Sequence, residues 1–122
     1  MKAAIWTGRV ISALIILFML FDSIAKIVRF KPYVVGTVAA GYPDHLVAIL
    51  GFVGLIPTIL YAIPRTSVLG AILLAAYWGG AVATHVRLEQ AAWPFPVVFG
   101  VLAWLALWMR EPRLRALVPF RS

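Results

Sequence analysis

The sequence predicts an all-α membrane protein: a polytopic four-helix bundle, with a short interfacial helix between spans one and two and both termini in the cytoplasm. Hydrophobic residues make up 64% of the 122 residues and charged residues only 12%, whereas soluble domains are about 45–50% apolar. The apolar residues form long runs with Lys and Arg at their ends, which is the pattern of membrane spans. A chain this short should form a single membrane domain over residues 1–122.

The basic composition does not indicate a nucleic-acid-binding protein. The formal charge is +7, but the cations flank the apolar runs, where they fit topology signals and anionic lipid headgroups. The chain has no cysteine, which excludes disulfides, thiolate metal sites and dithiol chemistry by the chain itself. No phosphate-binding loop, HExxH motif or nucleophile elbow is present. We therefore expect an integral membrane protein with no metal site.

Four apolar stretches are long enough to be considered as spans, at about residues 5–28, 44–63, 67–86 and 94–109. The first imitates a signal peptide with a weak Ser-Ile-Ala cleavage site. We expect it to remain as a span, because its removal would leave an odd set of three. Residues 31–43, KPYVVGTVAAGYP, are too short to span and contain prolines and glycines. They are expected to lie at the membrane interface.

The alternating spans divide the basic residues into two groups, and this division predicts the orientation. One side carries the chain start, the turn after span two and the C-terminal tail, with Lys2, Arg9, Arg65, Arg110, Arg113, Arg115 and Arg121. The other side carries Lys26, Arg29, Lys31 and Arg87. The richer side should be cytoplasmic.

The end of the third span, YWGGAVATHVR, combines small residues with a histidine close to the membrane surface. Ala75, Gly79 and Ala83 are four apart, with Gly80 beside them, and such spacing lets a neighbouring helix approach closely. Alternatively, the two glycines leave space beside His85. The first arrangement favours a structural histidine and the second a ligand-binding one.

Alternation of the spans also gathers polar residues from different helices in the outer third of the membrane. Asp22 and Lys26 have the favourable order for an ion pair on one helical face, and charges inside spans usually face the bundle interior and mark function. We take Asp22, Lys26 and His85 as candidate catalytic residues. The candidate ligand-binding set is Asp22, Lys26, His45, Trp78, Gly79, Gly80, His85 and Arg87.

Each of these residues also has a purely structural interpretation. The ion pair of Asp22 and Lys26 can simply fasten span one to its neighbours, or Lys26 can extend to the headgroups. His85 can make a hydrogen-bonded contact between helices. Trp78 can be a packing residue, and Arg87 a headgroup or topology residue.

Several segments resemble the DoxX-like family of small bacterial four-helix membrane proteins. They are GRVISALIILFMLFDSIAKI, GYPDHL, IPRTSVLGAILLAAYWGGAVATHVR and REPRLRALVP, which together cover nearly the whole chain. The resemblance implies a four-helix membrane bundle but no single activity, since relatives include a small subunit of a thiosulfate:quinone oxidoreductase and components of membrane oxidoreductase assemblies. It also implies that a glutamate often stands where this chain has Gly54, so any acid-base role here would fall on Asp22 or His85.

Three functions remain open at this stage. The first is a non-catalytic membrane module that binds a small apolar ligand, a quinone or a lipid, in an outer-half pocket and supports a partner oxidoreductase subunit or assembly. The second is an enzyme that transfers protons on a lipophilic substrate, with an isomerase-like reaction. The third is a structural assembly protein, and a homo-oligomer is compatible with all three.

Overall fold

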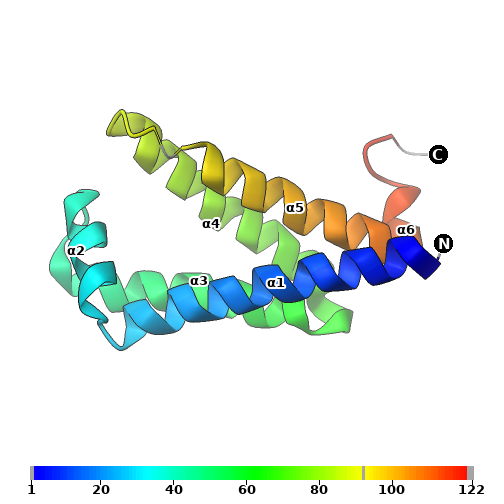
Figure 1. Ribbon diagram of the computed structural model, residues 1–122, viewed down its shortest axis with the longest axis horizontal. Coiled ribbons are helices and arrows are strands. Elements are labelled where there is room, and N and C mark those ends of the chain that lie inside the picture. The colour runs from blue at the N-terminus through cyan, green and yellow to red at the C-terminus, as the bar shows by residue number, and fades with distance from the viewer. Residues whose placement is uncertain (1, 92, 121–122) are drawn as a thin grey trace.

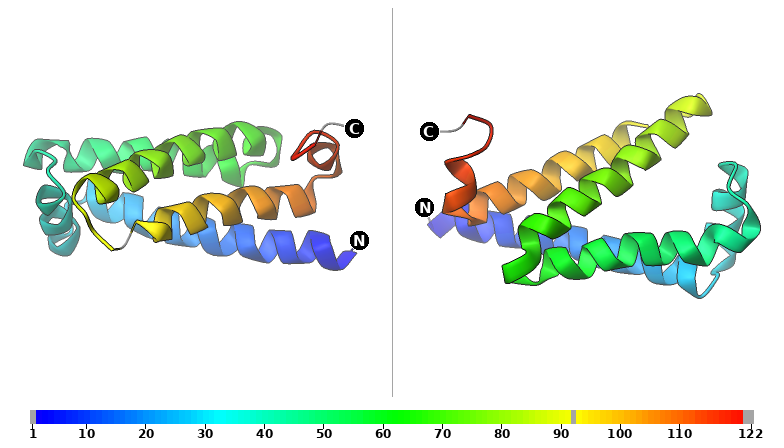
Figure 2. Two further views of the ribbon diagram at one scale, coloured as in Figure 1. Left: turned by 90° about the horizontal axis from the view of Figure 1, so that it is seen from above. Right: turned by 180° about the vertical axis from the view of Figure 1, so that it is seen from behind.

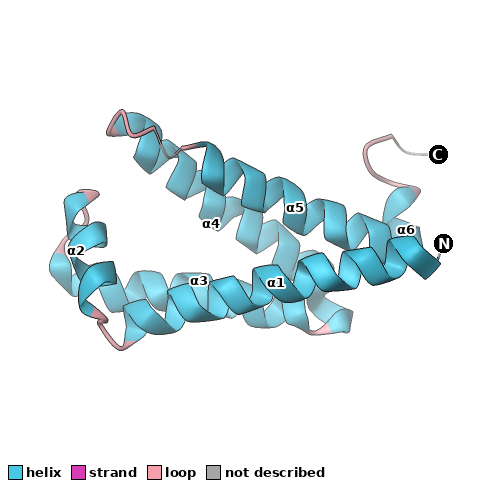
Figure 3. Ribbon diagram, in the orientation of Figure 1, coloured by secondary structure: helices cyan, strands magenta, loops and turns pink. Residues whose placement is uncertain are grey.

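A computed structural model describes residues 2–91 and 93–120, and over these residues the chain is helical without any strand (Figure 3). The prediction of an all-α protein is therefore confirmed. The helices in chain order are α1 (Lys2–Ile27), α2 (Lys31–Ala39), the 3-10 turn η1 (Asp44–Leu46), α3 (Val47–Ala62), the 3-10 turn η2 (Pro64–Thr66), α4 (Ser67–Arg87), α5 (Pro94–Arg110) and α6 (Pro112–Arg115).

Three helical stretches within the described residues are long and apolar enough to cross a membrane, namely Lys2–Ile27, Asp44–Ala62 and Pro64–Arg87. α5 is equally apolar but has 17 residues, a length of about 25 Å against a hydrocarbon core of about 30 Å. Large apolar side chains such as Leu17, Phe21 and Val101 are more than half exposed. Such surfaces are rare on soluble monomers, and these helices are compatible with a membrane helical bundle.

The long helices pack in a ring in which α1 and α4 lie diagonally opposite. α1 packs against α3 and α5, and α4 packs against the same two helices, whereas no backbone contact joins α1 to α4 in the described chain. Figures 1 and 2 show that α4 and α5 converge with α1 and α3 near α6, and diverge from them toward α2. The fold is therefore closed at one end and splayed at the other.

The closed end is held by a buried polar network that joins α1, α3 and α5. The Tyr61 hydroxyl donates to the Ala103 carbonyl at 2.7 Å and lies 3.0 Å from Ser12 Oγ, which in turn accepts from Arg110 Nε at 3.1 Å. Ser12 and Tyr61 are buried. The apolar core surrounds this network and extends toward the middle of the bundle, with Ile15, Met19, Ala71, Leu74, Trp78, Leu107 and Leu114.

Close helix approach depends on other glycines than the pair at the end of α4. A β-carbon added at Gly51 would lie 2.7 Å from the Ser23 carbonyl oxygen, and one added at Gly70 would lie 2.2 Å from the Tyr61 nitrogen. At Gly79 and Gly80, by contrast, an added β-carbon would meet no described atom within 4 Å. Of the two alternatives for this pair, close packing against a neighbouring helix or open space, the structure therefore shows open space.

Candidate functional site

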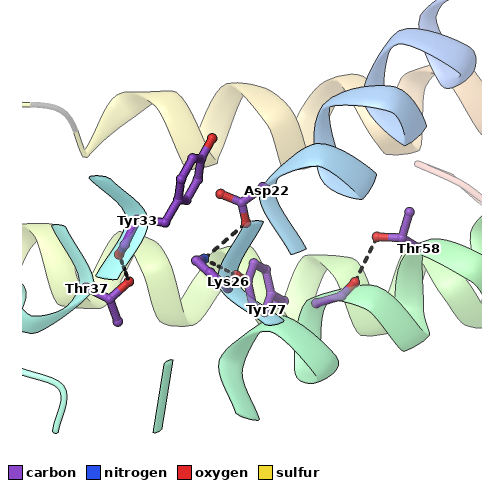
Figure 4. A network of polar contacts seen from close by, with 7 residues as sticks. Asp22, Lys26, Tyr33, Thr37, Thr58 and Tyr77 are labelled. Carbon is purple, nitrogen blue, oxygen red and sulfur yellow. Dashed lines mark hydrogen bonds and ion pairs between the residues drawn. The ribbon is translucent and has the colours of Figure 1, made fainter. Parts of the chain in front are cut away.

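A lysine on the last turn of α1 connects the two diagonal helices in the splayed half of the bundle. Lys26 Nζ donates to Asp22 Oδ2 at 3.0 Å and to the Tyr77 hydroxyl of α4 at 2.8 Å (Figure 4). The side chains of Lys26 and Asp22 are only 15% and 17% exposed. This triad is thus the polar link between α1 and α4, which share no backbone contact over the described residues.

Cavities lie on both sides of the link between Lys26 and Tyr77. The cavity toward α2 and α3, which we call the α3-side cavity, has a volume of about 380 Å³. The cavity toward α5, which we call the α5-side cavity, has a volume of about 260 Å³. Lys26, Tyr77, Ala81 and His85 line both of them, so the link stands between two neighbouring spaces inside the bundle.

The two cavities differ in their walls. Mostly small and aliphatic residues line the α3-side cavity, including Gly36, Ala40, Leu50, Val53, Ala76 and Gly80. Aromatic residues dominate the α5-side cavity, with Phe18, Trp78, Phe95 and Phe99 beside Asp22. Phe18 stacks on Phe99 with ring centroids 4.7 Å apart, and Trp78 lies 6.0 Å from Phe99. Apolar walls with a few convergent polar groups are typical of small-molecule sites.

The direction of the hydrogen bonds leaves donors free at the link. An ammonium group has three N–H donors and no acceptor, so Tyr77 must accept from Lys26, and its own O–H remains available as a donor. Lys26 uses two of its three N–H groups on Asp22 and Tyr77. The site therefore retains two unused hydrogen-bond donors, one on Lys26 and one on Tyr77.

His85 adds a complementary group to the same walls. Its Nδ1 is hydrogen-bonded to Gln90 Oε1 in the turn after α4. The amide oxygen is an acceptor, so Nδ1 carries the proton, and Nε2 of the neutral ring is left as an acceptor. The cavities thus contain donor groups from α1 and α4, Lys26 and Tyr77, and an acceptor from a later turn of α4, His85.

α2 and the loop after it cover the splayed end near the α3-side cavity. The Tyr42 hydroxyl lies 2.8 Å from Thr84 Oγ1 of α4, and Arg87 Nη2 donates to the Ala40 carbonyl at 3.3 Å. Arg29 pairs with Asp44 at 2.5 Å and ties the chain before α2 to the chain after it. These bonds hold α2 across the end of the bundle (Figure 1).

The negative charge of Asp22 also affects the pKa of a tyrosine on α2. Tyr33 of α2 lies beside the triad (Figure 4), and its pKa is raised above the ordinary tyrosine value, first by burial and then by the Asp22 carboxylate, while Lys26 acts in the opposite direction. The phenol of Tyr33 therefore remains protonated at neutral pH.

The residues singled out from the sequence fall into three groups in the structure. Asp22, Lys26, Trp78, Gly80 and His85 come together around the two cavities. Gly79 instead lines a separate outward groove between α4 and α5. His45 and Arg87 are exposed and line neither cavity.

Tyr77 is the site residue that sequence reasoning missed. It lies four and eight residues before Ala81 and His85, so the three share one face of α4, and this spacing was the available signal. Tyr77 also packs against the backbone of Gly54, where an added β-carbon would lie 3.2 Å from the ring and 3.0 Å from Ser23 Oγ. Gly54 thus stands directly behind the triad, and its lack of a side chain makes room for the Tyr77 ring.

Comparison with known proteins identifies a family but no individual relative. The family model described as the DoxX-like family matches residues 10–106. No curated protein and no solved structure matches the chain.

Proposed function

The chain belongs to the DoxX-like family, and we propose that this integral membrane protein binds a small lipophilic molecule, a quinone or a lipid, at the link between its two cavities. The observation that carries the proposal is the hydrogen bond between Lys26 and Tyr77, 2.8 Å long, at the shared wall of both cavities. It leaves donors for an acceptor oxygen within walls that are mostly apolar.

The chemistry of the walls supports a ligand with a carbonyl or hydroxyl oxygen on an apolar body. A carbonyl oxygen would accept from Lys26 and Tyr77, and a hydroxyl group would donate to Nε2 of His85. A quinone has the carbonyl oxygen that accepts, and its reduced form, the quinol, has the hydroxyl group that donates. The ester carbonyl of a lipid would be bound by the same two donors.

Mass spectrometry of the protein after mild detergent extraction from its membrane tests this proposal. We expect a lipophilic molecule to co-purify with the wild type, and its retention to fall about tenfold in Tyr77→Phe, which removes one donor from a desolvated site. Tyr33→Phe is the matched control, since it removes a phenol outside both cavities and should retain the ligand. Equal retention of the ligand in the two variants would contradict the proposal.

We further propose that the ligand-bound protein supports a partner oxidoreductase subunit or assembly. The chain has no cysteine, so it has no thiolates for an iron–sulfur cluster and no dithiol. Electron transfer to a bound quinone would then come from the partner. Affinity purification from native membranes, with and without Tyr77→Phe, would test whether a redox protein associates with the ligand-bound form.

The location and orientation belong to the same proposal. We place residues 1–122 as a single domain in a bacterial inner membrane with both termini in the cytoplasm, because Lys2, Arg9, Arg65, Arg113 and Arg115 gather at the closed end. A fluorescent reporter fused to the C-terminus should be active, and a periplasm-dependent phosphatase at the same place inactive. The opposite pattern would contradict the orientation.

Proton transfer on the bound molecule is the second candidate function. Asp22 and His85 line the same α5-side cavity of about 260 Å³, so a ligand there would lie between a carboxylate and an imidazole. If the site exchanges a C–H proton, the co-purified ligand should take up deuterium from D₂O in the wild type and not in Asp22→Asn. If the ligand of the wild type takes up no deuterium, the function would be ligand binding without proton transfer. If no ligand co-purifies, the result would favour the third function, a structural assembly protein.

A further inference from the structure

We propose that Arg110, at the closed end of the bundle, binds a phosphate group carried by a phospholipid headgroup or free in solution. This site lies at the end opposite the splayed half and does not depend on the proposed ligand. Arg110 is the last residue of α5, next to α6 and the start of α1 in Figure 1. The last residue of an apolar helix is expected at headgroup level, where phosphates are concentrated.

The guanidinium of Arg110 is held in place by buried groups. Its Nε donates to Ser12 Oγ at 3.1 Å, and its central carbon lies 5.3 Å from the centre of the Tyr61 ring. Ser12 and Tyr61 are themselves fixed by the polar network of the closed end. A side chain that is already ordered loses little conformational entropy when it binds a ligand.

Arg110 has no carboxylate partner among the residues that the structure describes. The ion pairs found there join Lys26 to Asp22, Arg29 to Asp44 and Arg113 to Glu111. A guanidinium has five N–H donors, and Arg110 uses one of them on Ser12. The four donors on its two Nη atoms have no acceptor within residues 2–91 and 93–120. Two of these donors form the planar fork that matches two oxygens of a phosphate.

The groups that would repel an anion near Arg110 are already hydrogen-bonded to other arginines. The C-terminal carbonyls of α5 carry partial negative charge, but Arg115 donates to the Trp108 carbonyl at 2.9 Å and to the Met109 carbonyl. The neighbouring carboxylate of Glu111 accepts from Arg113 through both its backbone N–H and its Nε, each at 3.3 Å. Arg110 thus keeps its free Nη donors beside groups that are already hydrogen-bonded to other cations.

A test compares variants of equal charge. Wild type, Arg110→Gln and Arg65→Gln are placed in nanodiscs of phosphatidylglycerol with phosphatidylcholine, and the lipid retained after transfer to detergent is counted by native mass spectrometry. We expect retention of phosphatidylglycerol to fall about tenfold or more in Arg110→Gln, which loses a charge-assisted fork. Arg65→Gln loses the same charge from an exposed residue of the turn η2, and retention should fall by less than about fivefold.

Further variants and ligands complete the test. Arg110→Lys keeps the charge without the fork, and it should also retain less phosphatidylglycerol than Arg65→Gln does. In detergent, inorganic phosphate is added instead of lipid: a rise in melting temperature that Arg110→Gln abolishes would identify free phosphate as the source. Equal losses in Arg110→Gln and Arg65→Gln, together with no effect of inorganic phosphate on the wild type, would overturn the proposal.

Discussion

The ammonium group of Lys26 lies 2.8 Å from the hydroxyl of Tyr77, although α1 and α4 have no backbone contact with each other in the described part of the chain. The hydrogen bond therefore spans the diagonal of the bundle, and it has a cavity on either side. A polar contact in this position both connects the splayed helices and leaves a donor facing the space between them.

The ion pair of Lys26 and Asp22 should contribute to stability mainly because each partner neutralises the other in a poorly solvated place. Lys26→Met leaves the Asp22 carboxylate without its cation, and we expect a loss of about 1–3 kcal/mol in the free energy of unfolding. The double variant with Asp22→Asn should regain part of that loss, because no unpaired charge remains. Thermal unfolding in detergent, followed by circular dichroism, measures both. A double variant less stable than the single one would show that the pairing is not the cause.

Two glycines of α4 should respond in opposite ways to the same substitution. Gly70→Ala would place a β-carbon 2.2 Å from the backbone of Tyr61, which forces α3 and α4 apart, and we expect a loss of about 2 kcal/mol or more. Gly80→Ala meets no described atom within 4 Å and should stabilise the helix by about 0.5–1 kcal/mol. Chemical denaturation in mixed micelles would compare the two variants, and similar effects would contradict the packing of α4.

The hydrogen bond between Tyr42 and Thr84 should hold α2 across the end of the bundle. Tyr42→Phe removes a bond whose net contribution is about 1 kcal/mol, which corresponds to roughly fivefold faster opening. Hydrogen exchange of the amides in α2 should accelerate accordingly, while exchange in α5 stays unchanged. Tyr33→Phe is the control, and α2 protection that is equal in both variants would exclude this role for Tyr42.

The sequence predicted the helices well because long apolar runs bounded by prolines and cations define them directly. Pro64 and Pro94 stand at the first positions of η2 and α5, where a proline costs no helical hydrogen bond. The pair of Asp22 and Lys26 was likewise predictable, since residues four apart share a helical face.

The site could be predicted only in part, because it depends on how far the helices diverge. Nothing in the spacing of Gly79 and Gly80 distinguishes a close contact from an open wall, and the structure shows an open one. Tyr77 was missed because its partner, Lys26, lies 51 residues away on a helix whose backbone does not contact α4 in the described residues. His45 was expected at the same level as His85, yet it lies in η1, outside both cavities.

The most direct test of the ligand site uses the two neighbouring glycines of α4. Gly80→Leu adds a side chain that projects into the α3-side cavity, whereas Gly79→Leu adds the same side chain to the outward groove. Both variants are extracted from their native membrane, and the small molecules that co-purify with each are quantified by mass spectrometry. We predict that Gly79→Leu retains the wild-type amount of a lipophilic ligand and that Gly80→Leu retains at least tenfold less. Equal amounts in the two variants, or no ligand in the wild type, would contradict the proposal that this protein binds a molecule beside Lys26 and Tyr77.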